Sequence, residues 1–269
     1  MESERHRLDL DGASVAYGVA GNGPRLLFVH GIGLDSRAWA PQVAELSSQF
    51  MVLYPDLRGH GQSAADSRTI TLSRFVEDMA ELLSAAPGDG PAHVCGNSLG
   101  ALIAVQLAAE HPGLVRSLTL SDGWVYNEAT TAGVDEMTAR LRSSSMESIA
   151  ATRVPVVFGP NASAQLIDSS LVIMGTKDFD AYVATSRAMW TADLRGACAH
   201  VRAPTLVVVG ELDLVSPPER SAELAGAIRG ARYQVIADVG HVPNLERADE
   251  FNRLLREWLA SVDDAEPDR

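Results

Sequence analysis

Short apolar runs alternate with amphipathic stretches along two parts of the chain, and this alternation limits the possible folds more than any other feature. Runs typical of strands lie at Arg25–His30, Phe50–Tyr54, Ala92–Gly96, Ser117–Ser121, Thr205–Val209 and Tyr233–Ala237, and the first, second and fifth are typical of buried strands. Stretches with helical spacing lie between or after them, around Trp39–Leu46 and at Phe75–Ala86, Leu99–Glu110, Pro218–Ile228 and Glu246–Val262. Alternating strands and helices predict an α/β fold on a mostly parallel sheet.

Two further strands are expected before this pattern begins. His6–Asp11 and Ala13–Ala20 alternate between apolar and polar residues, and the Asp11-Gly12 dipeptide between them is a strong hairpin signal. Ser36 can cap the helix that follows the third strand.

The alternation stops between Trp124 and His200, where 77 residues rich in Met, Ser, Thr and Ala contain no convincing strand. That length is too great for a loop. We therefore expect three or four short helices that form a cap over 124–200. The cap would be inserted into one core domain made of residues 1–123 and 201–269.

Charge and composition exclude several classes of function. The chain of 269 residues carries 22 basic and 35 acidic side chains, a net charge of −13, which argues against nucleic acid and anionic membranes as partners. Two cysteines are too few for a disulfide scaffold, and the sequence shows neither a signal peptide nor an apolar run of membrane-spanning length. We expect a cytoplasmic protein that acts on a small molecule without a metal or organic cofactor; a homodimer is compatible with the sequence.

The segment GNSLG at residues 96–100 follows a predicted strand and opens a predicted helix. A G-x-S-x-G motif in that context marks a sharp turn that presents a nucleophilic serine, here Ser98. Gly96 and Gly100 would provide room for the neighbouring backbone. The alternative is a plain strand–helix turn in which Ser98 is only the N-cap.

A serine nucleophile needs a base, and the base needs a carboxylate. His241 follows the strand at 233–237 and is the preferred base; His60 is the main competitor, and His30 is expected to brace a loop. Asp213 follows the strand at 205–209 and is the preferred acid, whereas Asp122 and Glu211 are rivals.

An ester hydrolase also needs two donors for the oxyanion. The backbone N–H of Leu99, at a helix N-terminus, is one candidate. The other is the N–H of Ile32 in the glycine-rich segment HGIG at residues 30–33. A phosphate-binding role for HGIG is disfavoured because no dinucleotide or Walker pattern follows it.

Together, HGIG, DLRGHGQS (56–63), GNSLG, GELD (210–213) and GHVPN (240–244) resemble the α/β-hydrolase superfamily over nearly the whole chain. The resemblance implies an eight-stranded sheet whose second strand is antiparallel, a helical cap after the sixth strand, and a Ser98–Asp213–His241 triad. Within the superfamily the motifs are similar to those of 3-oxoadipate enol-lactonases, bacterial esterases and meta-cleavage C–C hydrolases.

These features predict hydrolysis of an ester or lactone through an acyl-enzyme, with Trp124, Trp190 and Val242 as substrate-binding residues. Alternatives are C–C bond hydrolysis of a diketone, a lyase or cyclase that keeps the triad, and a ligand-binding receptor on the same fold. The cap cations Arg140, Arg142, Arg153, Lys177 and Arg187 offer partners for a substrate carboxylate, although each is favoured as a solvated charge. The acidic protein favours a neutral or singly charged substrate.

Overall fold

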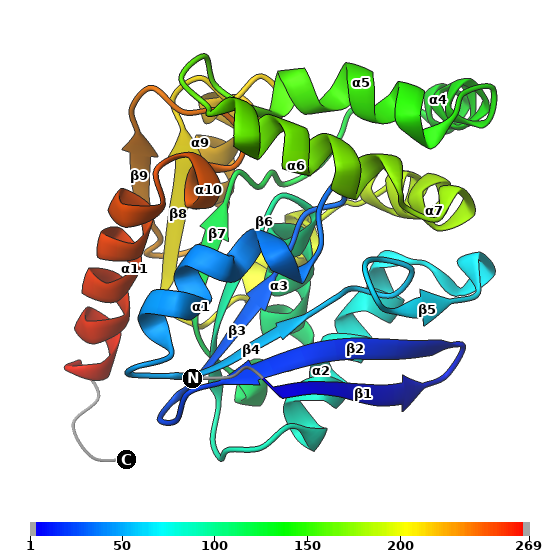
Figure 1. Cartoon of the computed structure of the whole chain (residues 1–269). Coiled ribbons are helices and arrows are strands. Elements are labelled where there is room, and N and C mark those ends of the chain that lie inside the picture. Colours follow the sequence, from blue (N-terminus) through cyan, green and yellow to red (C-terminus); the bar gives the residue numbers. More distant parts are fainter. Residues whose placement is uncertain (1–3, 266–269) are drawn as a thin grey trace.

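The computed structural model describes residues 4–265, and one sheet runs through the molecule (Figure 1). Its main path has the order β1-β2-β4-β3-β6-β7-β8-β9, and a short strand, β5, pairs with β2 outside this path. The strands are β1 Glu4–Leu10, β2 Ala13–Ala20, β3 Arg25–Val29, β4 Met51–Pro55, β5 Ala64–Ala65, β6 Ala92–Asn97, β7 Val115–Ser121, β8 Thr205–Gly210 and β9 Arg232–Ile236.

The pairing confirms the expected fold class. Strand β2 is antiparallel to both β1 and β4, whereas all pairs from β4 through β3, β6, β7 and β8 to β9 are parallel. The eight predicted strands form the main path. The one additional strand, β5, was not predicted because two residues are too few to show any periodicity.

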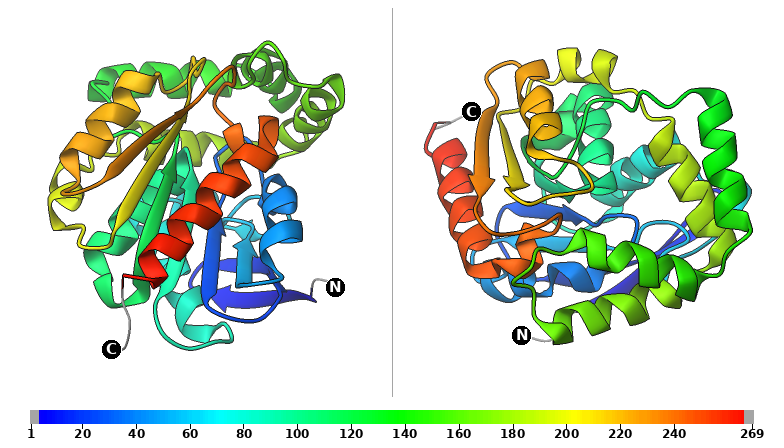
Figure 2. Two further views of the ribbon diagram at one scale, coloured as in Figure 1. Left: turned by 90° about the vertical axis from the view of Figure 1, so that its left-hand side faces the viewer. Right: turned by 90° about the horizontal axis from the view of Figure 1, so that it is seen from above.

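Helices cover both faces of the sheet (Figure 2). One face packs against α1 Ala40–Leu46 and α11 Ala248–Asp263, through side chains such as Leu46 and Phe251. The other face packs against α2 Leu72–Ala85, α3 Leu99–Glu110, α8 Arg195–His200 and α9 Pro218–Ala227. Helix α3 is apolar almost all round because it is buried between the sheet and its neighbours.

Two local expectations are corrected. The final helix does not begin at Glu246. The short helix α10 Pro243–Glu246 ends there, and Arg247, with a φ of −130° and a ψ of 55°, separates it from α11. The helix-capping side chain after β3 is Asp35 rather than Ser36, because the Asp35 carboxylate accepts the backbone N–H of Arg37 at the start of the 3-10 turn η1 Ser36–Trp39.

Four helices lie across the carboxyl ends of the parallel strands (Figure 1): α4 Thr131–Arg142, α5 Met146–Val157, α6 Ala164–Gly175 and α7 Phe179–Trp190. Their apolar side chains form a separate cluster with Leu34 and Val242 of the sheet's loops. Helix α8 falls within 124–200 but packs on the sheet side, where Cys198 joins the cluster that contains α3. The division into core and cap at residues 124 and 200 stays a prediction.

Among residues 4–265, no helix has the length and apolar character that crossing a bilayer requires.

Candidate active site

Ser98 lies at the sharp turn between β6 and α3, as the motif predicts. Its φ of 54° and ψ of −117° are unusual for a residue with a side chain, and they indicate a strained backbone. The flanking glycines are required by contact: a Cβ on Gly96 would stand 2.2 Å from the Gly100 oxygen, and one on Gly100 would stand 2.0 Å from the Val29 oxygen. The turn is therefore a tight elbow that only glycine permits at both positions.

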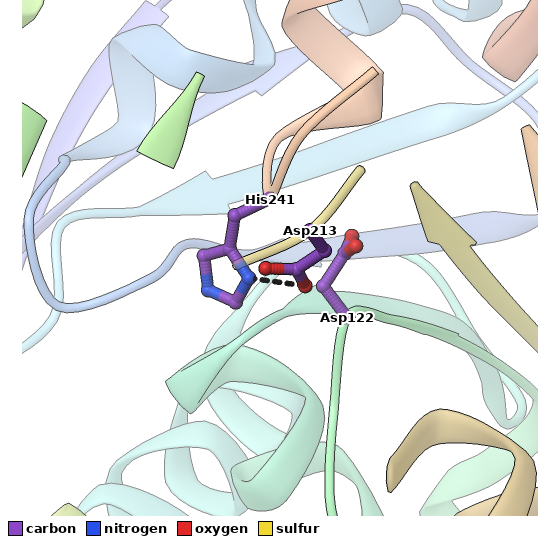
Figure 3. Close-up of side chains that lie close together, drawn as sticks. All are labelled: Asp122, Asp213 and His241. Carbon is purple, nitrogen blue, oxygen red and sulfur yellow. Dashed lines mark hydrogen bonds and ion pairs between the residues drawn. The ribbon is translucent and has the colours of Figure 1, made fainter. Parts of the chain in front are cut away.

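His241 and Asp213 come from the loops after β9 and β8, and their side chains meet (Figure 3). The Nδ1 atom of His241 lies 2.7 Å from Oδ2 of Asp213. The other carboxylate oxygen, Oδ1, accepts the backbone N–H groups of Val215 at 2.7 Å and Ser216 at 3.0 Å. Because the carboxylate engages Nδ1, the imidazole is held with Nε2 as its remaining basic nitrogen.

The backbone around His241 is fixed from two sides. The side-chain amide of Asn97 donates to the His241 carbonyl at 3.0 Å, and the His241 N–H donates to the Val157 carbonyl at 2.7 Å. Glu246 accepts the N–H groups of Gly240 at 2.9 Å and Gly159 at 2.8 Å, so one carboxylate joins the His241 loop to the turn after α5.

Asp122, the rival acid, lies beside the pair rather than within it. It is fully buried with a φ of 54°, and its carboxyl accepts from Gly210 N at 3.0 Å and from the Ser121 hydroxyl at 2.5 Å. Burial, with the nearby charge of Asp213, raises the pKa of Asp122 well above its usual range. The raised pKa favours the protonated form of Asp122.

The remaining candidates point elsewhere. Glu211 accepts the N–H of Asp238 on the surface. His30 has Nδ1 2.8 Å from the Gly31 carbonyl and accepts the Leu57 N–H at Nε2, so it braces the loop after β3. Burial lowers the pKa of His30 to about 4 and that of His60 well below its usual range, so both rings are neutral near pH 7. The ring centre of His60 lies 5.3 Å from that of His30, and His60 does not line the cavity that contains Ser98.

The two predicted oxyanion donors, the backbone N–H groups of Ile32 and Leu99, belong to segments next to Ser98. Ile32 follows Gly31, whose Cβ position would be 3.3 Å from the Ser98 Cβ, so the two segments are in close contact. Leu99 is the first residue of α3, where N–H groups lack helical partners. Within residues 4–265, neither N–H donates to a protein acceptor.

A cavity of about 210 Å³ opens over Ser98 and His241. The predicted binding residues Trp124, Trp190 and Val242 all line it, as does Ile32. Leu99 lies beneath the surface and is fully buried. The other lining is mainly apolar and comes from α5, the turn after it, α6 and α7, including Val154, Phe158, Met174, Tyr182 and Met189.

Two guanidinium groups line this cavity, and no Asp or Glu does so among the described residues. Arg153 on α5 has no hydrogen-bond or ion-pair partner within residues 4–265. Arg220 on α9 donates to Asn127 Oδ1 at 2.9 Å and lies 5.9 Å from the ring centre of Trp124, but contacts no carboxylate. Sequence reasoning missed Arg220 because no motif distinguishes it from other surface arginines of a helix.

The other cationic side chains of the predicted cap already have partners within the protein. Arg140, Arg142 and Arg187 form ion pairs with Glu136, Asp180 and Asp135, and Lys177 donates to a backbone carbonyl.

Asp122, Asp213 and His241 are also the one group in the described chain with the residue types and spacing of a metal site, since an atom from each lies within 4.8 Å of the others. The donor set does not suit a cation. Both oxygens of Asp213 already accept hydrogen bonds, and the raised pKa of Asp122 disfavours the charged carboxylate that a cation would bind.

Comparison with known proteins agrees with this geometry. The alpha/beta hydrolase family matches residues 26–254, and the chain belongs to that family. It is 27% identical to 3-oxoadipate enol-lactonase 1 of Acinetobacter baylyi over 248 residues, which cover 90% of each protein. It is 32% identical to the pimeloyl-[acyl-carrier protein] methyl ester esterase of Stenotrophomonas maltophilia, covering 92% of this chain and 97% of that protein.

Among solved structures, a thermophilic esterase from Thermogutta terrifontis superposes with a TM-score of 0.89 at 26% identity, over 96% of this chain and 99% of that one. The relatives support a hydrolase of the alpha/beta type that resembles the lactonase and esterase group.

Proposed function

We propose that this protein is a serine hydrolase that cleaves an ester or lactone through an acyl-enzyme. The observation that carries the proposal is the Asp213–His241 hydrogen bond of 2.7 Å, since His241 lines the same cavity as Ser98 at the strained elbow. An imidazole that is bound to a carboxylate and shares a cavity with a serine supplies the parts that nucleophilic acyl transfer requires.

In the proposed mechanism, Nε2 of His241 takes the proton of the Ser98 hydroxyl as its oxygen attacks the substrate carbonyl. Asp213 holds the ring orientation and stabilises the imidazolium that forms. The N–H groups of Ile32 and Leu99 donate to the oxyanion. The leaving alcohol then takes the proton from His241, the acyl group remains on Ser98, and a water activated by His241 releases the acid.

We further propose that the substrate carries one carboxylate away from the reacting carbonyl. In a protein of net charge −13, the reaction cavity is lined by two arginines and, in the described chain, by no acid. Guanidinium groups bind carboxylates through strong charge-assisted hydrogen bonds. Trp124, Trp190 and Val242 would contact the carbon chain between the two ends of the substrate.

The name of one relative fits such a substrate, since 3-oxoadipate enol-lactonase 1 is named for a compound derived from a dicarboxylic acid. This name supports the class of substrate proposed here and does not specify the compound.

The test uses purified protein with p-nitrophenyl butyrate and a simple γ-lactone, beside Ser98→Ala. We expect hydrolysis of at least one substrate, a loss of about 10⁴-fold or more in Ser98→Ala, and the mass increase of one fluorophosphonate adduct on the wild-type chain only. Unchanged turnover in Ser98→Ala would show that the nucleophile is assigned wrongly. Hydrolysis of a vinylogous diketone, but of no ester or lactone, would favour C–C bond cleavage instead.

A further inference from the structure

Lys177 is the only lysine in the chain; the other 21 basic residues are arginines. It lies in the turn between α6 and α7 and reaches across to the loop after β3. Its Nζ donates a hydrogen bond to the Leu34 carbonyl at 2.7 Å. A single side chain therefore connects the helices above the cavity with the segment that supplies the Ile32 N–H.

Leu34 closes the turn that contains Ile32. The Leu34 N–H donates to the Gly31 carbonyl at 3.2 Å, which encloses Ile32 and Gly33 between the two residues. The Gly31 carbonyl also accepts from Nδ1 of His30 at 2.8 Å. The Gly31 end of the turn is thus held by a hydrogen bond from His30, and the Leu34 end by one from Lys177.

A second side chain, Met174 of α6, packs against the same turn. A Cβ on Gly33 would stand 2.4 Å from the Cε atom of Met174, so the methionine occupies the space above that glycine. Met174 and Leu34 belong to one apolar cluster, against which Ile32 also packs. The end of α6 and the α6–α7 turn therefore contact Gly33 and Leu34.

We propose that Lys177 is a positioning residue, which fastens the α6–α7 turn to the Leu34 carbonyl and thereby holds the Ile32 N–H where it stabilises the oxyanion. The proposal rests on the serine hydrolase function proposed above. A compact ammonium on a narrow stem suits a single carbonyl in a crowded position, where the planar guanidinium of arginine needs more room. Small displacements of an oxyanion donor are costly, since removal of one lowers kcat by about 10²–10³-fold.

The surroundings of Lys177 make its charge sensitive to pH. It lines a polar cavity of about 480 Å³, separate from the reaction cavity, together with Asp35, Asp56, Asp178, Arg5 and Arg37. Burial lowers its pKa to about 8, Asp35 and Asp56 oppose this, and Arg37 adds to it. The buried rings of His30 and His60 also face its charge and are neutral near pH 7. The ammonium therefore loses its proton in mildly alkaline solution, whereas an arginine there would not.

The first experiment compares Lys177→Met and Lys177→Arg with wild type, and uses Arg142→Met as a matched control, since Arg142 pairs with Asp180 on the exposed side of α7. With p-nitrophenyl butyrate we expect Lys177→Met to lower kcat by about 10-fold to 100-fold, with KM changed less than threefold. Its affinity for a trifluoromethyl ketone, whose adduct carries an oxyanion, should fall in parallel. Lys177→Arg should recover part of the loss, and Arg142→Met should behave like wild type.

A pH profile adds a readout that a purely structural role would not change. Selective labelling of the single lysine with ¹⁵N gives one side-chain resonance, whose titration midpoint should match an alkaline decline in kcat. In Lys177→Arg this decline should move to higher pH. An unchanged kcat and ketone affinity in Lys177→Met, or a rise in KM alone, would show that the proposal is wrong.

The hydrogen exchange of residues 31–34 separates this proposal from the proposed function. We expect faster amide exchange there in Lys177→Met than in wild type, with exchange in β8 unchanged. If wild type shows no Ser98-dependent hydrolysis, the proposed function fails, while exchange still reports on the attachment of the turn. Unchanged exchange would overturn the attachment whatever the activity.

Discussion

The carboxyl groups of Asp122 and Asp213 lie together beside the ring of His241, where burial and the nearby Asp213 raise the pKa of Asp122 well above its usual range (Figure 3). Asp213 accepts two backbone N–H groups and contacts Nδ1 of His241. Asp122 accepts the Gly210 N–H and the Ser121 hydroxyl instead, and does not contact the ring. The geometry therefore gives the contact with His241 to Asp213, while the pKa of its buried neighbour is raised.

The first prediction compares the two acids by replacing one carboxyl group at a time. We expect Asp213→Asn to lower kcat by about 10³–10⁴-fold, because an amide cannot hold the imidazole in the correct tautomer. Asp122→Asn replaces a neutral acid with a neutral amide and should change kcat by less than about 10-fold. Steady-state kinetics on p-nitrophenyl butyrate provides the measurement. Equal losses in the two variants would mean that Asp122 shares the role of the acid.

The second prediction concerns the elbow. In Gly100→Ala the new methyl group would overlap the Val29 and His30 carbonyl oxygens, at 2.0 and 3.0 Å, which are backbone atoms that cannot move aside. We expect a loss of several kcal/mol in the free energy of unfolding, or failure to fold. Gly113→Ala is the control because nothing lies within 4 Å of its Cβ position. Urea denaturation followed by circular dichroism measures both; a Gly100→Ala variant as stable as the control would contradict the close packing at the elbow.

Much of the fold could be predicted because the buried strands are short, apolar and regularly spaced. The strand at 205–209 is predicted within one residue of β8, and the helix at 99–110 coincides with α3. The break at Arg247 was not predictable, because the residues around it keep helical spacing on both sides. The capping role of Asp35 likewise depends on where the backbone turns, and Ser36 has an equally suitable side chain.

The site was predictable where function demands an unusual local sequence. GNSLG and GHVPN place Ser98 and His241 at strand ends, and the structure brings their loops into one cavity. Residues that contact the site from distant parts of the sequence belong to no such motif. Arg220 enters the cavity from α9, 122 positions after Ser98 in the chain, and Lys177 attaches to Leu34 across 143 positions. Only the folded arrangement reveals either contact.

The third prediction tests the anionic end of the substrate. Arg220→Met and Arg153→Met should each raise KM for a mono-p-nitrophenyl ester of adipic acid by about 10-fold to 100-fold, the worth of one charge-assisted hydrogen bond. KM for neutral p-nitrophenyl hexanoate should stay within about threefold. Arg187→Met serves as the control, since Arg187 pairs with exposed Asp135. Equal KM changes for the charged and neutral esters would argue against a carboxylate-binding role.

The fourth prediction concerns Glu246, whose two oxygens accept the N–H groups of Gly240 and Gly159. In Glu246→Gln the amide nitrogen would face one of these N–H groups and leave it without an acceptor. We expect a loss of about 1–3 kcal/mol in the free energy of unfolding and a several-fold fall in kcat as the His241 loop loosens. Glu257→Gln, which alters an exposed pair with Arg253, should change neither quantity. A Glu246→Gln variant with wild-type stability and kcat would show that the bridge is dispensable.

The last prediction turns the raised pKa of Asp122 into a dependence of stability on pH. The folded protein keeps a proton on Asp122 at pH values where the unfolded chain, with an ordinary Asp pKa near 4, has released it. This group therefore contributes its full stabilisation below that pH, and the contribution is lost as the pH rises through the folded pKa. Asp122→Asn has no proton to lose, so its free energy of unfolding, relative to wild type, should increase between pH 5 and pH 8 by up to about 1.4 kcal/mol per pH unit. Urea denaturation of both proteins across that range measures the difference, and other titrating groups cancel in it because they are common to both. A constant difference would mean that the pKa of Asp122 is not raised in the folded protein.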